Sequence, residues 1–185
     1  MRRITLIIAV VALLSASVVA LDGGFKRIRE ELISYQEVPS VSSVASGDFK
    51  AKISNDESRI DYELSYSDLE GAVQQSHIHF GQKGVNGGIS VFLCTNLGNG
   101  PAGVQPCPPS PATITGTIVA ADVSPNIPAT AGARTQGINT GELAELIKAI
   151  RAGSTYVNVH STTWPGGEIR SQIDGDSGHH DHDDH

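Results

Sequence analysis

Cysteine is scarce in this chain: Cys94 and Cys107 are the only two among its 185 residues. They do not form a CxxC pair, which weakens the case for two thiolate metal ligands. An even number of cysteines separated by a loop instead indicates one disulfide in an exported protein. Metal ligation by the two thiolates remains the alternative. We therefore expect a Cys94–Cys107 bond that closes a long turn.

Positive charge is also in short supply, with 13 Lys and Arg against 20 Asp and Glu and a formal net charge of −7. Nucleic-acid binding requires a basic face, so this balance argues against it. The glycine-rich turn 81–88 lacks the Gly-Lys-Ser/Thr ending of a phosphate-binding loop. No GxSxG elbow supports hydrolase chemistry, and no Asn-x-Ser/Thr sequon predicts N-glycosylation.

The one long apolar run is at the N-terminus. Two arginines precede the apolar residues 4–14, and small residues follow as far as Ala20. This pattern predicts a secretory signal peptide, residues 1–20, and a secreted, periplasmic or cell-surface protein with no membrane contact after cleavage. A retained anchor is the alternative if the apolar region extends to Val19, although a spanning helix needs about 20 apolar residues.

Strand patterns dominate the remaining domain, residues 21–174, which is the length of one ordinary domain. Polar and apolar residues alternate in several short segments bounded by turn residues, as they do in strands with one face against a core. The predicted strands are 47–53, 59–66, 89–94, 112–120, 156–160 and 168–173.

A single helix is predicted near Thr140–Arg151. Asn139 and Glu142 have the spacing of a capping box, with Asn in place of Ser or Thr. Four apolar residues then recur at helical spacing on one face, and Gly153 is suited to end the helix in a left-handed conformation. These patterns predict an all-β domain with one short covering helix.

Two histidines stand two residues apart in the predicted strand SHIHF. Side chains alternate along a strand, so His77 and His79 point away from the face on which Ile78 packs. The same alternation in YVNVH places His160 on the outer face. If the strands are neighbours, the three histidines form one cluster, with four polar side chains around it: Tyr156, Asn158, Glu168 and Arg170.

Three imidazoles on one face are a ligand set that suits copper or zinc, with a fourth position left to water, a carboxylate or a substrate. In that case Tyr156, Asn158 and Glu168 are candidates to orient the rings through outer-shell contacts. The alternative is that the histidines are exposed on a sheet face and bond only to neighbours and solvent.

The C-terminal residues 175–185 are rich in histidine and aspartate and contain nothing that could enter a core. Such a composition predicts disorder. The segment is either a natural metal-scavenging tail or part of a purification tag, and its interleaved aspartates favour the former. Its four histidines are His179, His180, His182 and His185.

Several motifs together resemble the CHRD domain, a module named for its repeats in chordin and also found alone in exported microbial proteins. In chain order they are QEVP at 36–39, the hairpin 47–66, SHIHFGQKGVNGGISVFL, ITGTI, GELAELIKAIRAGSTYVNVHS and WPGGEIRSQI. The resemblance runs from about Phe25 to Ile173. It implies an antiparallel Greek-key β-sandwich or barrel similar to the Cu,Zn superoxide dismutase fold.

The same resemblance leaves the activity open. A dismutase dinuclear site uses about six histidines and an aspartate, whereas this domain offers three histidines, enough for a mononuclear site. The predicted function is therefore an exported metal-binding protein without established catalysis. The alternatives are a metal-free extracellular module that binds a protein partner, as chordin binds growth factors, and a dismutase-like copper enzyme in which Arg170 guides an anionic substrate.

Overall fold

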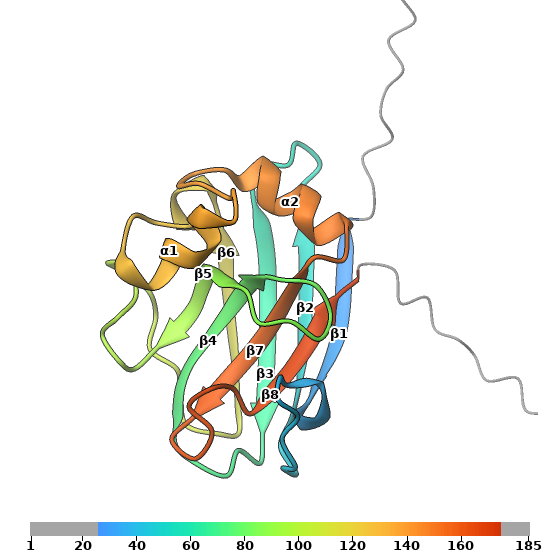
Figure 1. Cartoon of the computed structure of the whole chain (residues 1–185), viewed down its shortest axis with the longest axis vertical. Coiled ribbons are helices and arrows are strands. Elements are labelled where there is room, and N and C mark those ends of the chain that lie inside the picture. Colours follow the sequence, from blue (N-terminus) through green and yellow to red (C-terminus); the bar gives the residue numbers. More distant parts are fainter. Residues whose placement is uncertain (1–25, 175–185) are drawn as a thin grey trace, which may run out of the picture.

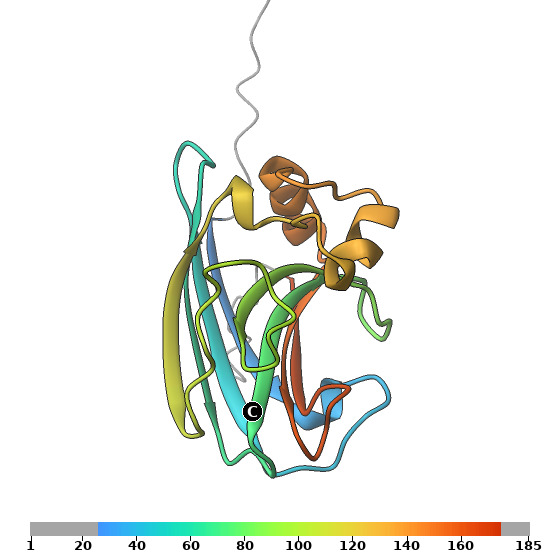
Figure 2. The ribbon, with the colours of Figure 1, turned by 90° about the vertical axis from the view of Figure 1, so that its left-hand side faces the viewer.

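The computed structural model describes residues 26–174, and the predicted signal peptide and histidine-rich tail lie outside this range. Eight antiparallel strands wrap around one core, and two helices lie at one end (Figures 1 and 2). The strands are β1 (Arg27–Ile33), β2 (Ser46–Ile53), β3 (Ile60–Ser67), β4 (Val73–Phe80), β5 (Gly88–Thr95), β6 (Ala112–Ile118), β7 (Thr155–Ser161) and β8 (Ile169–Ile173).

The strands form one sheet in the order β5-β4-β7-β8-β1-β2-β3-β6. Three connections, β3 to β4, β5 to β6 and β6 to β7, join strands that are not neighbours in the sheet, while the others are local. The result is a nearly closed, all-antiparallel barrel of Greek-key type, which confirms the predicted fold class. The curvature brings β4, β7 and β8 together on one side of the barrel.

Alternation builds the core as the sequence indicated. In β2 and β3 every second residue is buried, and β2 carries exposed charged residues between them. The buried set includes Phe49, Leu64, Ile78, Val157 and Ile169, each 1 % exposed or less. Burying such side chains contributes about 1.5–3 kcal/mol each, before the opposing loss of chain entropy.

The two sheet edges, β5 and β6, approach each other without a backbone ladder between them in the described chain. Gln105 bridges them: its side-chain amide donates to the carbonyl of Leu93 in β5 at 3.2 Å and of Thr115 in β6 at 3.1 Å. The hydroxyl of Tyr62 also donates to the Leu93 carbonyl, at 3.1 Å. This seam is thus closed by side chains.

A Cys94–Cys107 disulfide fixes the loop that carries Gln105, as predicted from the sequence. Asn96 reinforces the closure, because its side chain accepts from the Cys107 amide at 3.0 Å and donates to the Cys107 carbonyl at 2.9 Å. Cross-linking a loop of this length contributes about 3 kcal/mol in the chain-entropy model.

The predicted helix is α2 (Leu143–Arg151), whose apolar stripe is buried against one end of the barrel. The capping box is only half formed: the Glu142 carboxylate accepts from the Asn139 amide at 2.7 Å, but Glu142 itself is the N-cap residue and no side-chain cap bond forms there. Gly153 follows with a φ of 63°, as expected for a glycine after a helix end.

The structure contains further elements that the sequence patterns did not predict: the strand β1, the short helix α1 (Ala131–Thr135) and the 3₁₀ turns η1 (Ser34–Gln36), η2 (Ala120–Asp122) and η3 (Pro128–Thr130). In β1 the alternation is interrupted at Glu30, which stands on the inward face between the buried residues Ile28 and Leu32. Within residues 26–174, no helix has the length and apolarity needed to cross a bilayer.

Candidate metal centre

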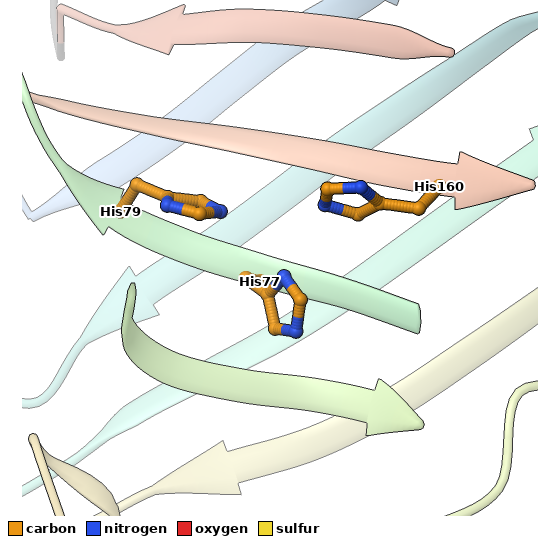
Figure 3. A group of neighbouring side chains, drawn as sticks. All are labelled: His77, His79 and His160. Atoms are coloured by element: carbon orange, nitrogen blue, oxygen red, sulfur yellow. The ribbon is translucent and has the colours of Figure 1, made fainter. Parts of the chain in front are cut away.

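The three histidines come from two adjacent strands. β4 pairs with β7 so that His77 lies opposite Asn158, His79 opposite Tyr156, and Gln75 opposite His160. One ligand nitrogen from each histidine lies within 4.8 Å of the other two, and Figure 3 shows the three rings facing a common space. The predicted clustering of His77, His79 and His160 is therefore present.

Two irregularities on the other side of β4 shape this cluster. The register between β4 and β5 shifts between Ser76 and His77, and again between Ile78 and His79. Such bulges bend a strand and re-aim its side chains. Here Ile78 remains in the core, while Phe92 of β5 comes opposite His77 and its ring meets the imidazole edge-on, with 4.4 Å between centroids.

The outer face at this place is covered, contrary to the alternative of histidines exposed on a sheet face. His77 is 0 % exposed, His160 6 % and His79 7 %. The His79 ring stacks on Tyr156, with 4.6 Å between centroids and 3° between planes. The imidazoles therefore have little solvent with which to form hydrogen bonds.

Backbone carbonyls set the tautomers of two histidines. Nδ1 of His79 lies 2.9 Å from the Gly87 carbonyl, and Nδ1 of His160 lies 3.0 Å from the Pro165 carbonyl. A carbonyl can only accept, so each Nδ1 carries the proton and each neutral ring presents a lone pair on Nε2. This arrangement resembles the outer-shell hydrogen bonds that orient metal-binding histidines.

Several ring nitrogens have no partner. Both nitrogens of His77 and Nε2 of His79 are buried without a hydrogen bond to any described group. Leaving a buried polar atom unsatisfied costs about 1–3 kcal/mol, so such atoms are uncommon without a reason. A cation bound between the rings would satisfy these lone pairs, and the donor set therefore fits a metal ion.

Burial also keeps the imidazoles in the form that ligates a metal. The pKa of His77 lies well below its ordinary value of 6.5, mainly because burial penalises the charged ring and secondarily because His79 and His160 are close. Burial lowers the pKa of His79 to about 3 and also lowers the pKa of His160. All three rings are therefore neutral at physiological pH.

Arg170 and Tyr156 hold the loop that orients His79. The Arg170 guanidinium lies 3.4 Å from the centroid of the Tyr156 ring and donates to the carbonyl of Val85 at 2.9 Å and to Oδ1 of Asn86 at 3.1 Å. The Tyr156 hydroxyl accepts from the amide of Gly87 at 3.2 Å. These contacts connect both predicted neighbours to the loop carbonyl that fixes the His79 tautomer.

Glu168 lies apart from this arrangement. Its side chain is buried, and Oε1 accepts from the Ser43 hydroxyl at 2.7 Å and from the Glu70 amide at 2.8 Å. These bonds connect two loops, and none of Glu168's hydrogen bonds within residues 26–174 reaches a histidine. The structure thus gives Glu168 the geometry of a loop anchor.

Glu37, to which no sequence pattern assigned a role, brings its carboxylate close to the cluster. Glu37 is 4 % exposed, and its Oε1 accepts from the Asn158 side chain at 3.3 Å. Burial raises the pKa of Glu37, partly offset by hydrogen bonds and by the charge of Arg170. The only sequence signal for Glu37 was its place in the QEVP motif. That motif does not indicate a contact with Asn158, which is 121 residues further along the chain.

The chain matches the family model of the CHRD domain over residues 28–173, which include all the residues of the cluster. No curated protein and no solved structure matches it. The family and the disulfide support an extracellular-type module. By the extent of this match, and with the motif-bearing segments meeting around one three-histidine cluster, the chain belongs to the CHRD domain family.

Proposed function

We propose that this is an exported protein that binds one copper or zinc ion through His77, His79 and His160. The observation that carries the proposal is the cluster of three buried, neutral imidazoles, in which both nitrogens of His77 and Nε2 of His79 lack hydrogen-bond partners. Two of the rings have their tautomers set by backbone carbonyls, which leaves Nε2 free to ligate. The signal peptide predicted at residues 1–20 would direct the chain to the compartment in which its disulfide persists.

Binding requires a small closure of the site. Nitrogens that are 2.0–2.1 Å from a tetrahedral metal are about 3.4 Å from each other. The ligand atoms here extend to 4.8 Å, so the widest pair has to approach by more than 1 Å. Rotation of the rings about their side-chain torsions would have to supply this change. In the bound state, Tyr156 and Arg170 would keep the Gly87 carbonyl on His79.

The burial of Arg170 favours metal binding over dismutase-like catalysis. A residue that guides an anionic substrate has to present its charge to the solvent route of that substrate. Arg170 is 1 % exposed, and its guanidinium is committed to Tyr156, Val85 and Asn86. We therefore rank binding without catalysis above the redox alternative, and the metal-free interaction module remains the second candidate on family grounds.

Metal uptake by a chain without tail histidines tests this function. In the test protein, His179, His180, His182 and His185 are replaced by serine, because the tail would chelate ions whether or not the site exists. We expect one copper or zinc ion per chain, measured by competition with a chromophoric chelator. The matched control adds His77→Ala, His79→Ala and His160→Ala. Equal uptake by both proteins would refute the site.

A further inference from the structure

Asn158 stands at the centre of the cluster rather than at its margin. It is the β7 residue directly opposite His77, it is 2 % exposed, and its Oδ1 lies 3.1 Å from Nε2 of His160. The side chain therefore projects from the same outer face as the three imidazoles. Its amide carries one acceptor oxygen and one donor nitrogen, so the orientation of the amide decides what it can contribute.

Glu37 determines that orientation. The Asn158 amide nitrogen donates to Oε1 of Glu37 at 3.3 Å, and the ionised carboxylate, which the Val38 amide and the charge of Arg170 favour, can only accept. Turning the amide over would place its oxygen against the carboxylate oxygen. Glu37 thus directs Oδ1 of Asn158 toward His160.

The position of Glu37 is itself built by two segments of the chain. Its other oxygen, Oε2, accepts from the amide of Val38 at 3.3 Å within the QEVP segment. On the opposite side, a Cβ at Gly167 would overlap the Glu37 carboxylate, and Gly167 has a φ of 129° that side chains rarely adopt. The glycine of WPGGE therefore leaves the space that this carboxylate occupies.

The orientation creates a conflict at His160. Its Nδ1 proton is donated to the Pro165 carbonyl, so the neutral ring turns the lone pair of Nε2 toward Asn158. Oδ1 of Asn158 also presents a lone pair. Two acceptors therefore lie 3.1 Å apart without a proton to share. A cation placed among the rings would accept from both atoms and remove the conflict.

We infer that Oδ1 of Asn158 is the fourth protein ligand of the metal, held in place by Glu37 as a positioning residue. This inference rests on the proposed function, since it requires that the histidines bind an ion. It assigns an N₃O donor set to a divalent ion, zinc or oxidised copper. Four protein ligands leave no open position, which is typical of structural and storage sites rather than catalytic ones.

The principal test substitutes the fourth ligand in the chain that lacks tail histidines. Asn158→Leu removes the donor at similar size, whereas Asn158→Asp retains an oxygen donor. We expect Asn158→Leu to weaken zinc affinity by roughly tenfold to a hundredfold. Losses of this size occur even when the group removed only hydrogen-bonds to a ligand. Asn158→Asp should bind zinc more tightly than Asn158→Leu does, because it keeps the oxygen donor. The visible spectrum of bound cobalt(II) should change for Leu and remain tetrahedral for Asp.

Gly167→Ala provides a test that touches no ligand. It displaces the Glu37 carboxylate and should weaken zinc binding severalfold, whereas Gly166→Ala, at a neighbouring position with open space, should not. If Asn158→Leu keeps the parent's zinc affinity and cobalt spectrum, Asn158 is not a ligand, and the three-histidine site stands without it. If the parent chain binds no metal, the proposed function itself fails.

A measurement on the parent protein covers the case in which Asn158→Leu does not fold. Water-proton relaxation by the copper(II)-loaded parent reports water bound directly to the ion. A site closed by Asn158 should show no exchanging inner-sphere water, and a bound water would overturn the assignment.

Discussion

Two parts of the barrel differ in whether the outer face of the sheet is exposed to solvent. In β2, the residues Asp48, Lys50 and Lys52 alternate with core residues and face solvent. In β7 and β8, residues on both faces of the strands are buried. The sequences of both parts alternate polar and apolar residues. Alternation therefore identifies the core face of a strand, but it does not reveal whether the other face meets water.

The difference lies in what covers each part. Loops from several parts of the chain lie over β4, β7 and β8, and Arg170, Glu37 and Gln172 are among the polar side chains they enclose. Buried polar groups are mostly hydrogen-bonded, so outside the histidine cluster this face is held largely by directed contacts. The open face of β1, β2, β3 and β6 has weaker, solvent-exposed ion pairs. Changes to the two faces should consequently differ in effect.

Acidification should affect the covered face most. The native pKa values of His77 and His79 lie below that of an unfolded histidine, so the unfolded chain binds more protons below pH 6.5. The metal-free protein should therefore lose stability as pH falls from 6.5, by roughly 2 kcal/mol from His79 alone at pH 5, with a further loss from His77. The loss for His79 should continue to about pH 3.

Urea unfolding at a series of pH values measures this dependence. The control replaces both residues, His77→Phe and His79→Phe, and should have a flatter profile between pH 5 and 6.5. A parent protein whose stability is the same at pH 5 and pH 7 would show that the rings are not buried in their neutral form.

Arg170→Met should be the most damaging of the charge removals. It leaves the buried Glu37 carboxylate without its cationic neighbour and frees the carbonyl of Val85. The cost should be about 3–5 kcal/mol, because two hydrogen bonds from a charged group, at about 1.5–3 kcal/mol each, are lost. Chemical denaturation should report that loss, together with weaker metal binding because the Gly87 loop is no longer held. A loss below 1 kcal/mol would contradict the view that Arg170 organises the covered face.

Removal of the disulfide should have an intermediate effect. Cys94→Ser with Cys107→Ser releases the loop that closes the seam between the two faces. The chain-entropy model gives a loss of about 3 kcal/mol. The midpoint of urea unfolding should fall accordingly, while metal affinity should remain close to that of the parent. A large decrease in metal affinity would instead show that the structure of the seam affects the metal site.

Lys50→Met should have the smallest effect and serves as the counterpart of Arg170→Met. Lys50 pairs with Glu63 at 3.0 Å, but both side chains are about half exposed. Exposed ion pairs contribute about 0–1 kcal/mol, and added salt screens them. Denaturation at low and high ionic strength should detect little difference from the parent. A loss of stability comparable with that of Arg170→Met would contradict the view that charges on the covered face contribute more to stability than charges on the exposed face.

Much of the site could be predicted from the sequence because strand alternation is a local property. It placed His77, His79 and His160 on one face and Ile78 on the other, whereas the pairing of β4 with β7 that joins them was only a condition of the prediction. The disulfide was predictable from an even number of cysteines, without CxxC spacing, in a chain with a predicted export signal. These features required no knowledge of how distant loops fold back.

The cover over the site was not predictable in the same way. Glu37 reaches Asn158 through a loop 121 residues away in sequence, and no periodic pattern encodes such a contact. Likewise, Glu168 shares the alternation of the cluster residues but bonds to Ser43 and Glu70. The strand β1 was missed because Glu30 stands at an inward position of its alternation, and tertiary pairing with β2 overrides that local signal.

The seam closed by Gln105 has a consequence for the chain before it is oxidised. An unpaired strand edge is a template on which another chain can add a strand, and this barrel has two such edges side by side. The loop that shields them is fastened by the Cys94–Cys107 bond. Thiol oxidation therefore also protects against edge-to-edge aggregation, and the protein should remain soluble most readily where its two thiols have already been joined.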